Sequence, residues 1–171
     1  MSAQTTAAAD DARRIFNELT GELEYSMLII TTAAEGHLAG CLVGFATQCS
    51  IEPPRFLVFL SQTNRTLRVA EGSDALLVHF VPADAAGLVE LFGAETGDEV
   101  DKFALCRWRR GPRGLPVLQD CPRWFAGRIL ERLPGGDHVG FLLEPFAAEN
   151  AGDASAFLFH RAKRLEPGHA P

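Results

Sequence analysis

Two runs of strand-forming residues joined by a double proline place the strongest constraint on how this chain can fold. They lie in residues 39–66, which read AGCLVGFATQCSIEPPRFLVFLSQTNRT. The first run predicts a strand over about residues 38–49 and the second a strand over 55–60, because both are rich in β-branched, aromatic and aliphatic side chains. The tripeptide Glu52-Pro53-Pro54 predicts a corner between them, since proline removes a backbone donor and disfavours helix before it. With the strand expected just upstream, these two would be the second and third strands of an antiparallel sheet.

A short loop made of hydrogen-bonding side chains follows the second run. Residues 61–66, SQTNRT, offer hydroxyls, amides and one guanidinium just ahead of a helical pattern. Such groups are a good chemical match to the oxygen atoms of a phosphate. The sequence therefore predicts an anion-binding loop, whose candidate ligands are Ser61, Gln62, Asn64, Arg65 and Thr66.

Size and charge limit the function classes that remain. The chain has 171 residues and a formal net charge of -6, with hydrophobic residues at 47%. This length suits one domain with a real core, and the acidic balance argues against a general nucleic-acid binder. We see neither a signal peptide nor a membrane-spanning run, so a cytoplasmic protein that binds no membrane is expected.

The four cysteines predict no metal centre. Cys41, Cys49, Cys106 and Cys121 form no CxxC pair and have no histidine at ligand spacing. In a reducing compartment they are expected to be small buried hydrophobes.

The rest of the chain alternates short strands with a few helices. A helix over residues 10–19, with Asp10 and Asp11 as cap and first-turn acids, would lie on the domain surface through Ile15, Phe16 and Leu19. A hairpin turn is expected at Glu35-Gly36. The further expected elements are strands at 24–33, 75–81, 115–118, 123–132, 138–146 and 156–160, and helices at 66–71 and from the cap Asp84 to about 92. Since strands outnumber helices without βαβα alternation, we expect a mainly β fold, a barrel with helices attached.

Two charged segments stand out between these elements. The acidic run ETGDEVD, residues 95–101, is most simply a solvated face or turn. The segment RWRRGPRG, residues 107–114, carries four arginines and is expected to be a loop with a local basic patch.

A series of short motifs, taken in order, resembles the flavin reductase family with the FMN-binding split-barrel fold. The resemblance spans residues 25–159, and the ordered set is more specific than any one of its members. The motifs are Thr47 to Pro54, Asn64-Arg65-Thr66, Asp101-Lys102-Phe103, Trp108, Gly114 to Leu118, Trp124 and Gly136-Asp137-His138.

The resemblance implies a Greek-key antiparallel split barrel that forms a homodimer and binds FMN or FAD. It implies a domain over residues 23–162, after a lead-in and helix at 1–22 and before a polar tail at 163–171. The flavin ring and ribityl chain would contact Thr47, Gln48, Cys49 and Ser50. The flavin phosphate would lie on the loop already predicted to bind an anion.

Two histidines receive different interpretations. The resemblance implies that His138 positions the nicotinamide or the incoming substrate, while a turn histidine bonded to Asp137 is the alternative. His79 lies among apolar residues of a predicted strand and is expected to be a satisfied core residue.

The chain departs from the family pattern in three places, and in one of them Gln48 and Cys49 replace what is more often a serine and a valine. Gly44-Phe45-Ala46 replaces small polar residues beside the flavin ring. The segment FHRAKRL, starting at Phe159, resembles a shortened version of a family strand.

The resemblance implies reduction of FMN or FAD by NADH or NADPH, with the reduced flavin passed to a separate monooxygenase. The sequence contains no triad or GxGxxG motif, so the nicotinamide would bind transiently over the flavin. One alternative is a flavin carrier or store without turnover. Another is a small β-barrel interaction domain whose basic loop, Arg107 to Arg113, binds an acidic partner.

Overall fold

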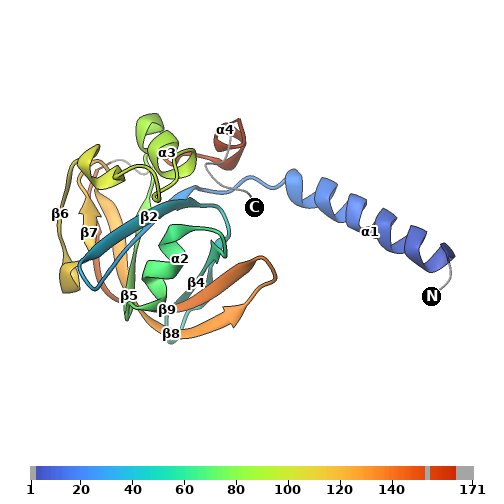
Figure 1. Cartoon of the computed structure of the whole chain (residues 1–171), viewed down its shortest axis with the longest axis horizontal. Coiled ribbons are helices and arrows are strands. Elements are labelled where there is room, and N and C mark those ends of the chain that lie inside the picture. The colour runs from blue at the N-terminus through green and yellow to red at the C-terminus, as the bar shows by residue number, and fades with distance from the viewer. Residues whose placement is uncertain (1–2, 153–154, 165–171) are drawn as a thin grey trace.

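A seven-stranded antiparallel sheet forms the centre of the computed structural model, which describes residues 3–152 and 155–164 (Figure 1). Its strand order is β2-β1-β5-β8-β9-β4-β3, and β6 and β7 form a separate pair. The mainly β fold with attached helices is confirmed, although the sheet does not close into a complete barrel. The strands are β1 (Leu28–Ala34), β2 (His37–Val43), β3 (Ala46–Ser50), β4 (Arg55–Ser61), β5 (Ala75–Phe80), β6 (Trp108–Arg110), β7 (Pro116–Leu118), β8 (Arg123–Pro134) and β9 (His138–Asn150).

The chain changes from one edge of the sheet to the other at Gly44 and Phe45. Strand β2 pairs only with β1 at one edge, and β3 pairs only with β4 at the opposite edge. The backbone N–H of Phe59 donates to the carbonyl of Phe45 at 2.9 Å, which anchors the crossing. A Cβ at Gly44 would lie 2.7 Å from the Tyr25 ring, so glycine allows this close approach.

The predicted single strand over residues 38–49 is therefore wrong, because it consists of β2 and β3. The expected antiparallel sheet is confirmed, but the strand over residues 55–60 is the fourth in chain order and not the third. Strand propensity is high on both sides of Gly44, but propensity does not reveal that the pairing partner changes. The corner at residues 51–54 is confirmed, because it joins β3 and β4 as antiparallel neighbours.

Helix α2 (Arg65–Glu71) fills the opening that the sheet leaves between β2 and β4. Its side chains Leu67 and Ala70 are buried and pack with apolar residues of β1, β2, β4 and β9. The side chain of Asn64 accepts a hydrogen bond from the backbone N–H of Thr66 at 2.8 Å, which caps the helix. The predicted helix at 66–71 is confirmed, and the predicted polar loop leads directly into it.

A second core lies on the outer side of β1, beneath helices α3 (Ala86–Gly93), η1 (Lys102–Ala104) and α4 (Phe159–Ala162). The residues Ile29, Val89, Phe92 and Phe103 are all buried in it. Helix α3 begins after Ala85, which makes no side-chain cap bond, so the predicted cap at Asp84 is wrong.

The predicted last strand over residues 156–160 is wrong. Ala156 and Leu158 form only isolated bridges, to Pro82 and Ser26. The chain then turns into helix α4, and the Phe159 ring stacks on Tyr25 with centroids 4.6 Å apart. The segment FHRAKRL thus begins with a helix and not with a family strand.

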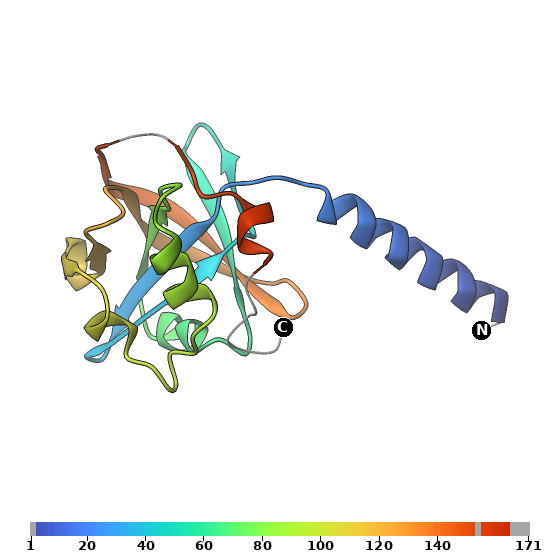
Figure 2. The ribbon, with the colours of Figure 1, turned by 90° about the horizontal axis from the view of Figure 1, so that it is seen from above.

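Helix α1 (Ala3–Gly21) projects away from the sheet (Figures 1 and 2). It is longer than the predicted helix, so Asp10 and Asp11 lie within it and do not cap it. The side chains Ile15, Phe16 and Leu19 are 42%, 62% and 60% exposed. Their predicted packing on the chain's own domain is therefore wrong.

Several smaller expectations can be compared with the structure. Glu35 and Gly36 both have positive φ and form the predicted hairpin turn. The segment at 107–114 is less irregular than expected, since it contains β6 and the 3-10 turn η2 (Pro112–Gly114). Cys41 and Cys121 are buried as predicted, but Cys49 is exposed and Cys106 only half-buried.

The predicted domain limits stay a prediction, and residues 165–171 of the predicted tail lie outside the described residues. Within the part of the chain that the structure describes, none of the helices combines the length and apolarity that a bilayer crossing requires.

His79 is confirmed as a satisfied core histidine. It is fully buried, and its Nδ1 donates to the carbonyl of Ile29 at 3.0 Å while its Nε2 accepts from the backbone N–H of Leu118 at 3.0 Å. This pairing requires a neutral ring, and burial lowers the pKa of His79 to about 3.

We expect this histidine to make the protein less stable as pH falls below the ordinary histidine range. The unfolded chain takes up the proton near pH 6.5, whereas the folded chain resists protonation down to about pH 3. Between pH 7 and pH 5 the free energy of unfolding should therefore fall by about 2 kcal/mol from this group alone. Urea unfolding of the wild type and of His79→Gln at both pH values measures it. An equal pH dependence in the two proteins would contradict the assignment.

Candidate functional site

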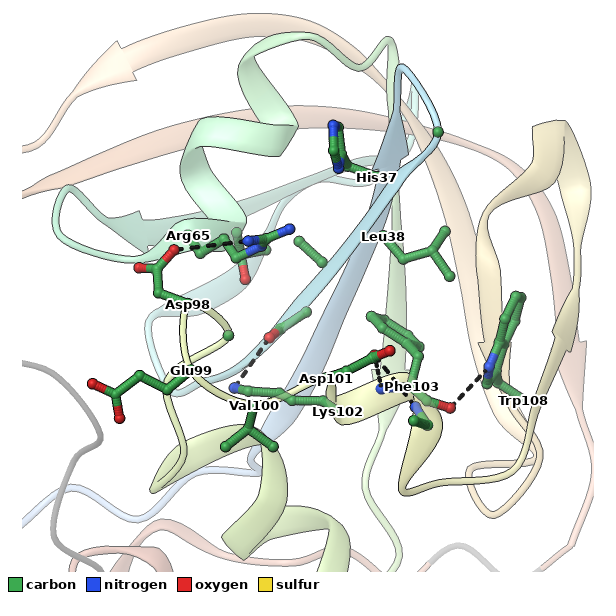
Figure 3. Close-up of a pocket in the computed structure, with 16 residues that line it drawn as sticks. His37, Leu38, Arg65, Asp98, Glu99, Val100, Asp101, Lys102, Phe103 and Trp108 are labelled. Atoms are coloured by element: carbon green, nitrogen blue, oxygen red, sulfur yellow. Dashed lines mark hydrogen bonds and ion pairs between the residues drawn. The ribbon is translucent and has the colours of Figure 1, made fainter.

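Two cavities lie along β2, close to the start of α2. The larger one, here named the edge cavity, has a volume of about 620 Å³ and runs along β2 beneath residues 97–104 (Figure 3). Its chemistry-bearing lining residues are His37, Arg65, Thr66, Asp98, Glu99, Asp101, Lys102, Phe103 and Trp108.

The second cavity, here named the aromatic groove, has a volume of about 330 Å³. It runs from the end of β2 to the start of β9 and is bordered by α4. Aromatic rings and a few polar groups line it, among them Tyr25, Cys41, Phe45, Phe59, Ser61, Asn64, His138, Phe159 and Lys163. Both volumes are in the range of small-molecule sites.

The predicted anion-binding loop is shared between the two cavities. Ser61 and Asn64 line the aromatic groove, while Arg65 and Thr66 line the edge cavity. Gln62 lines neither cavity. Its Nε2 donates to the carbonyl of Gly136 at 2.8 Å, which ties the loop to the turn before β9.

The predicted ring-binding segment lies elsewhere. Thr47, Gln48 and Cys49 are exposed on the edge strand β3, and neither they nor Ser50 line the two cavities. The Gln48 side chain instead donates to the carbonyl of Ser50 at 3.1 Å. Contact of these four residues with a flavin ring stays a prediction.

The rings of His138 and Phe45 contact each other in the aromatic groove. Their ring centroids are 5.2 Å apart in an edge-to-face arrangement. Strand pairing sets His138 opposite Ser61, and its Nδ1 lies 2.7 Å from Oδ1 of Asp137. The hydrogen bond from His138 holds the pKa of Asp137 below its ordinary value. This geometry leaves the Nε2 edge of His138 available to a ligand while Asp137 orients the ring.

Lys102 is a site residue to which the sequence interpretation assigned no role. Only 5% of it is exposed, and its Nζ donates to the carbonyls of Gly40 and Phe92 at 3.4 and 3.3 Å. Among the ion pairs of residues 3–152 and 155–164, none includes Lys102. Burial lowers the pKa of its ammonium. A buried cation without a carboxylate is costly, and an anionic ligand in the edge cavity would complete it.

The position of Lys102 explains why sequence alone missed it. The motif Asp101-Lys102-Phe103 was visible, but a lysine beside an acidic run is usually a surface residue. Asp101 accepts hydrogen bonds from the backbone N–H groups of Phe103 and Ala104, which fixes η1 and turns Lys102 inward (Figure 3).

Arg65 is the second cation of the edge cavity. Its Nη1 lies 3.8 Å from Oδ1 of Asp98, whereas Nη2 of Arg68 lies 2.5 and 2.7 Å from the two oxygens of Asp98. Hydrogen bonds from Arg68 are the main reason that the pKa of Asp98 is lowered. Arg65 thus keeps a guanidinium whose hydrogen-bonding capacity Asp98 does not use.

Comparison with known proteins places this architecture among flavin enzymes. The family model described as flavin reductase like domain matches residues 20–168. The chain is 29% identical to FMN reductase (NADH) RutF of Variovorax paradoxus over 77% of this chain and 72% of that protein. It is 27% identical to FMN reductase (NADH) RutF of Methylorubrum extorquens over 91% of this chain and 76% of that protein.

Solved structures share the fold at lower identity. Nitrilotriacetate monooxygenase component B from Mycobacterium thermoresistibile matches with a TM-score of 0.78 and 21% identity, over 95% of this chain and 94% of that one. The NADH:FAD oxidoreductase SgcE6 of Streptomyces globisporus matches with a TM-score of 0.77 and 21% identity, over 86% and 87% of the two chains.

We expect replacement of Lys102 by methionine to leave stability nearly unchanged. Methionine fills a similar volume, and removing a buried charge without a carboxylate partner offsets the loss of two long hydrogen bonds. The free energy of unfolding of Lys102→Met should stay within about 1 kcal/mol of the wild type. Urea unfolding at pH 7 checks this. A loss above about 3 kcal/mol would show instead that the ammonium holds β2 and α3 together.

Proposed function

Because the chain belongs to the flavin reductase-like family, we propose that it is a flavin reductase that uses reduced nicotinamide to reduce FMN or FAD. FMN and NADH are the favoured pair, since they are the substrates named for both RutF relatives. The observation that carries the proposal is an edge cavity lined by the buried ammonium of Lys102 and the guanidinium of Arg65, next to a groove lined by aromatic rings.

The edge cavity suits the phosphate end of a flavin. Lys102 supplies a buried ammonium, Arg65 a guanidinium and Thr66 a buried hydroxyl, all lining one cavity. Charged donors of this kind are the usual ligands of phosphate oxygens. These residues therefore fit the group that the family binds, and they extend the predicted phosphate loop by Lys102.

The aromatic groove suits a planar ring. Phe45 is 57% exposed at its border, where an aromatic face can cover a ring at little cost in conformational entropy. Ser61 and Asn64 line the groove, and the next residues of the same loop, Arg65 and Thr66, line the edge cavity. The loop therefore connects the proposed ring site with the proposed phosphate site. Thr47, Gln48, Cys49 and Ser50 stay candidates for further ring contacts through the exposed side of β3.

When it is bound, the flavin supplies the redox chemistry by accepting two electrons and a proton from the reduced nicotinamide. The chain's own residues position the two molecules and limit access of water. His138 lies on the groove wall with Asp137 fixing its ring, so its Nε2 edge can hydrogen-bond the nicotinamide amide. This requires no acid or base in the protein.

The proposed physiological role is supply of reduced flavin to a separate monooxygenase. The name of one structural neighbour, nitrilotriacetate monooxygenase component B, supports this role by analogy of fold. The proposed location is the cytoplasm, where reduced nicotinamides are formed.

The interaction-domain alternative loses its main support in the structure. Arg107 pairs with Asp120, Arg109 with Glu149 and Arg113 with Asp74, so three arginines of the basic loop already have intramolecular partners. The flavin carrier without turnover remains the second candidate, since binding geometry alone does not require access for a nicotinamide.

The spectrum of the purified protein tests the proposal, followed by addition of FMN and then of NADH or NADPH. Loss of the oxidised-flavin absorbance at a rate proportional to protein concentration is expected. Binding of FMN without that loss would identify a carrier. Absence of any effect of FMN on spectrum or thermal stability would contradict both flavin functions.

His138→Ala should impair use of the nicotinamide and leave flavin binding intact. With the positioning bond lost, kcat/KM for NADH should fall by about tenfold, as expected for one hydrogen bond, while the Kd for FMN stays unchanged. Steady-state kinetics and flavin titration measure the two effects separately. Loss of flavin affinity together with stability would show that His138 is only a turn residue.

We also propose a homodimer, supported by helix α1. Its apolar stripe, Ile15, Phe16 and Leu19, is exposed, and Figures 1 and 2 show the helix projecting away from the sheet. Isolated helices of this length are marginal in water unless packing covers their apolar face. A second copy of the chain is the proposed cover, and a two-fold arrangement would satisfy both helices at once.

A charge placed in this stripe should break the dimer. Leu19→Asp buries a carboxylate at the proposed interface, whereas Asn17→Asp adds the same charge to an exposed position outside the stripe. Sedimentation should show monomers for the first variant and dimers for the second. A wild type that sediments as a monomer would contradict the proposed assembly.

A further inference from the structure

Asp98 lies between two arginines and is bound unequally by them. Arg68 donates to both of its oxygens, at 2.5 and 2.7 Å, whereas Arg65 approaches only to 3.8 Å, beyond hydrogen-bond distance. Arg68 therefore satisfies the carboxylate by itself. Arg65 makes no hydrogen bond to Asp98 but forms a longer ion pair with it, so the carboxylate already offsets part of the positive charge that Arg65 would offer to another anion.

The backbone holds Asp98 close to Arg65. A Cβ at Gly97 would lie 3.2 Å from Cδ of Arg65, so the glycine lets the acidic segment pack directly on the arginine stem. The backbone N–H of Asp98 donates to the hydroxyl of Thr96 at 3.3 Å. Figure 3 shows the carboxylate and the guanidinium facing each other across the wall of the edge cavity.

Asp98 therefore places a negative charge next to Arg65 in the proposed phosphate site. The carboxylate of Asp98 is charged at neutral pH, and hydrogen bonds from Arg68 lower its pKa further. Side-chain exposures of 35% for Arg65 and 47% for Asp98 mean that solvent screens the pair, so the competition is moderate. Moderate weakening of phosphate binding is what an enzyme needs if its flavin must leave after each reduction.

We propose that Asp98 competes with the flavin phosphate for Arg65 and thereby keeps the flavin an exchangeable substrate and not a tightly held prosthetic group. This inference rests on the proposed flavin reductase function. It gives the acidic run at residues 95–101 a role at the site, and it assigns the residue that sets how long the flavin stays bound.

The test compares the binding of FMN with that of riboflavin, which has the same ring but no phosphate. Flavin fluorescence titration and stopped-flow dissociation are measured for the wild type, Asp98→Asn, Arg65→Ala and the double variant. Asp98→Asn should lower the Kd for FMN about three- to fivefold and slow its release by a similar factor, the size expected for one exposed ion pair. The Kd for riboflavin should not change.

Arg65 must mediate the effect. Arg65→Ala should raise the Kd for FMN about tenfold, as expected for loss of a charged hydrogen bond. Adding Asp98→Asn to Arg65→Ala should then bring no further tightening, because the residue for which Asp98 competes is gone.

Asp74→Asn is the matched control. It also removes one carboxylate from an exposed arginine pair, with Arg113, and lies outside the lining of the edge cavity. Equal tightening of FMN by Asp74→Asn, or tightening of riboflavin by Asp98→Asn, would overturn the proposal in favour of a general effect.

Two further results would separate failure of this inference from failure of the proposed function. Weaker or unchanged FMN binding by Asp98→Asn, with Arg65→Ala still weakening FMN, would overturn this inference and leave the proposed function intact. A wild type that binds neither flavin would overturn both.

Discussion

The crossing of the chain from β2 to β3 at Gly44 and Phe45 is the constraint on which the rest of the structure depends. Since β2 pairs with β1 and β3 with β4, the sheet has two free edges on either side of one opening. Helix α2 fills that opening with apolar side chains. The polar loop before it lies at the border of the opening, and both cavities follow.

Two buried basic side chains, His79 and Lys102, have different environments in this fold. His79 has a carbonyl acceptor and an amide donor within 3.0 Å, is neutral, and connects β5 with β1 and with Leu118 of β7. Lys102 is nearly as buried, and its Nζ makes two long hydrogen bonds to carbonyls and lies over the Phe92 ring at 5.5 Å from the centroid. Folding gives both ring nitrogens of the histidine a hydrogen-bond partner, whereas it buries the lysine ammonium and thereby lowers its pKa. A buried ammonium that lines a cavity is a candidate ligand-binding group, and in this respect Lys102 differs from His79.

Charge in this protein acts locally. The net charge of -6 would oppose an anionic ligand, yet a cation pair lines one cavity within the acidic surface. The arginines at 107–113 that looked like a basic patch are largely neutralised by carboxylates from other segments. The acidic run forms the predicted solvated turn, and its Asp98 also pairs with Arg65 and Arg68. Ion pairs with distant segments therefore determine which charges of the two runs can act on a ligand or a partner.

The sequence by itself determined the mainly β fold, the corner at residues 51–54, the helix after the polar loop and the satisfied state of His79. Each of these depends on local patterns: strand periodicity, proline geometry, a cap residue and an apolar neighbourhood. Only the tertiary structure decided that the run from Leu38 to Cys49 splits across two edges, because pairing partners are chosen by segments far away in the chain. It likewise decided that Lys102 is buried and lines the same cavity as Arg65 and Thr66, since more than one element separates these residues in the sequence. Local propensity acts within a few residues, whereas a binding cavity is made by packing between segments that have no local relation.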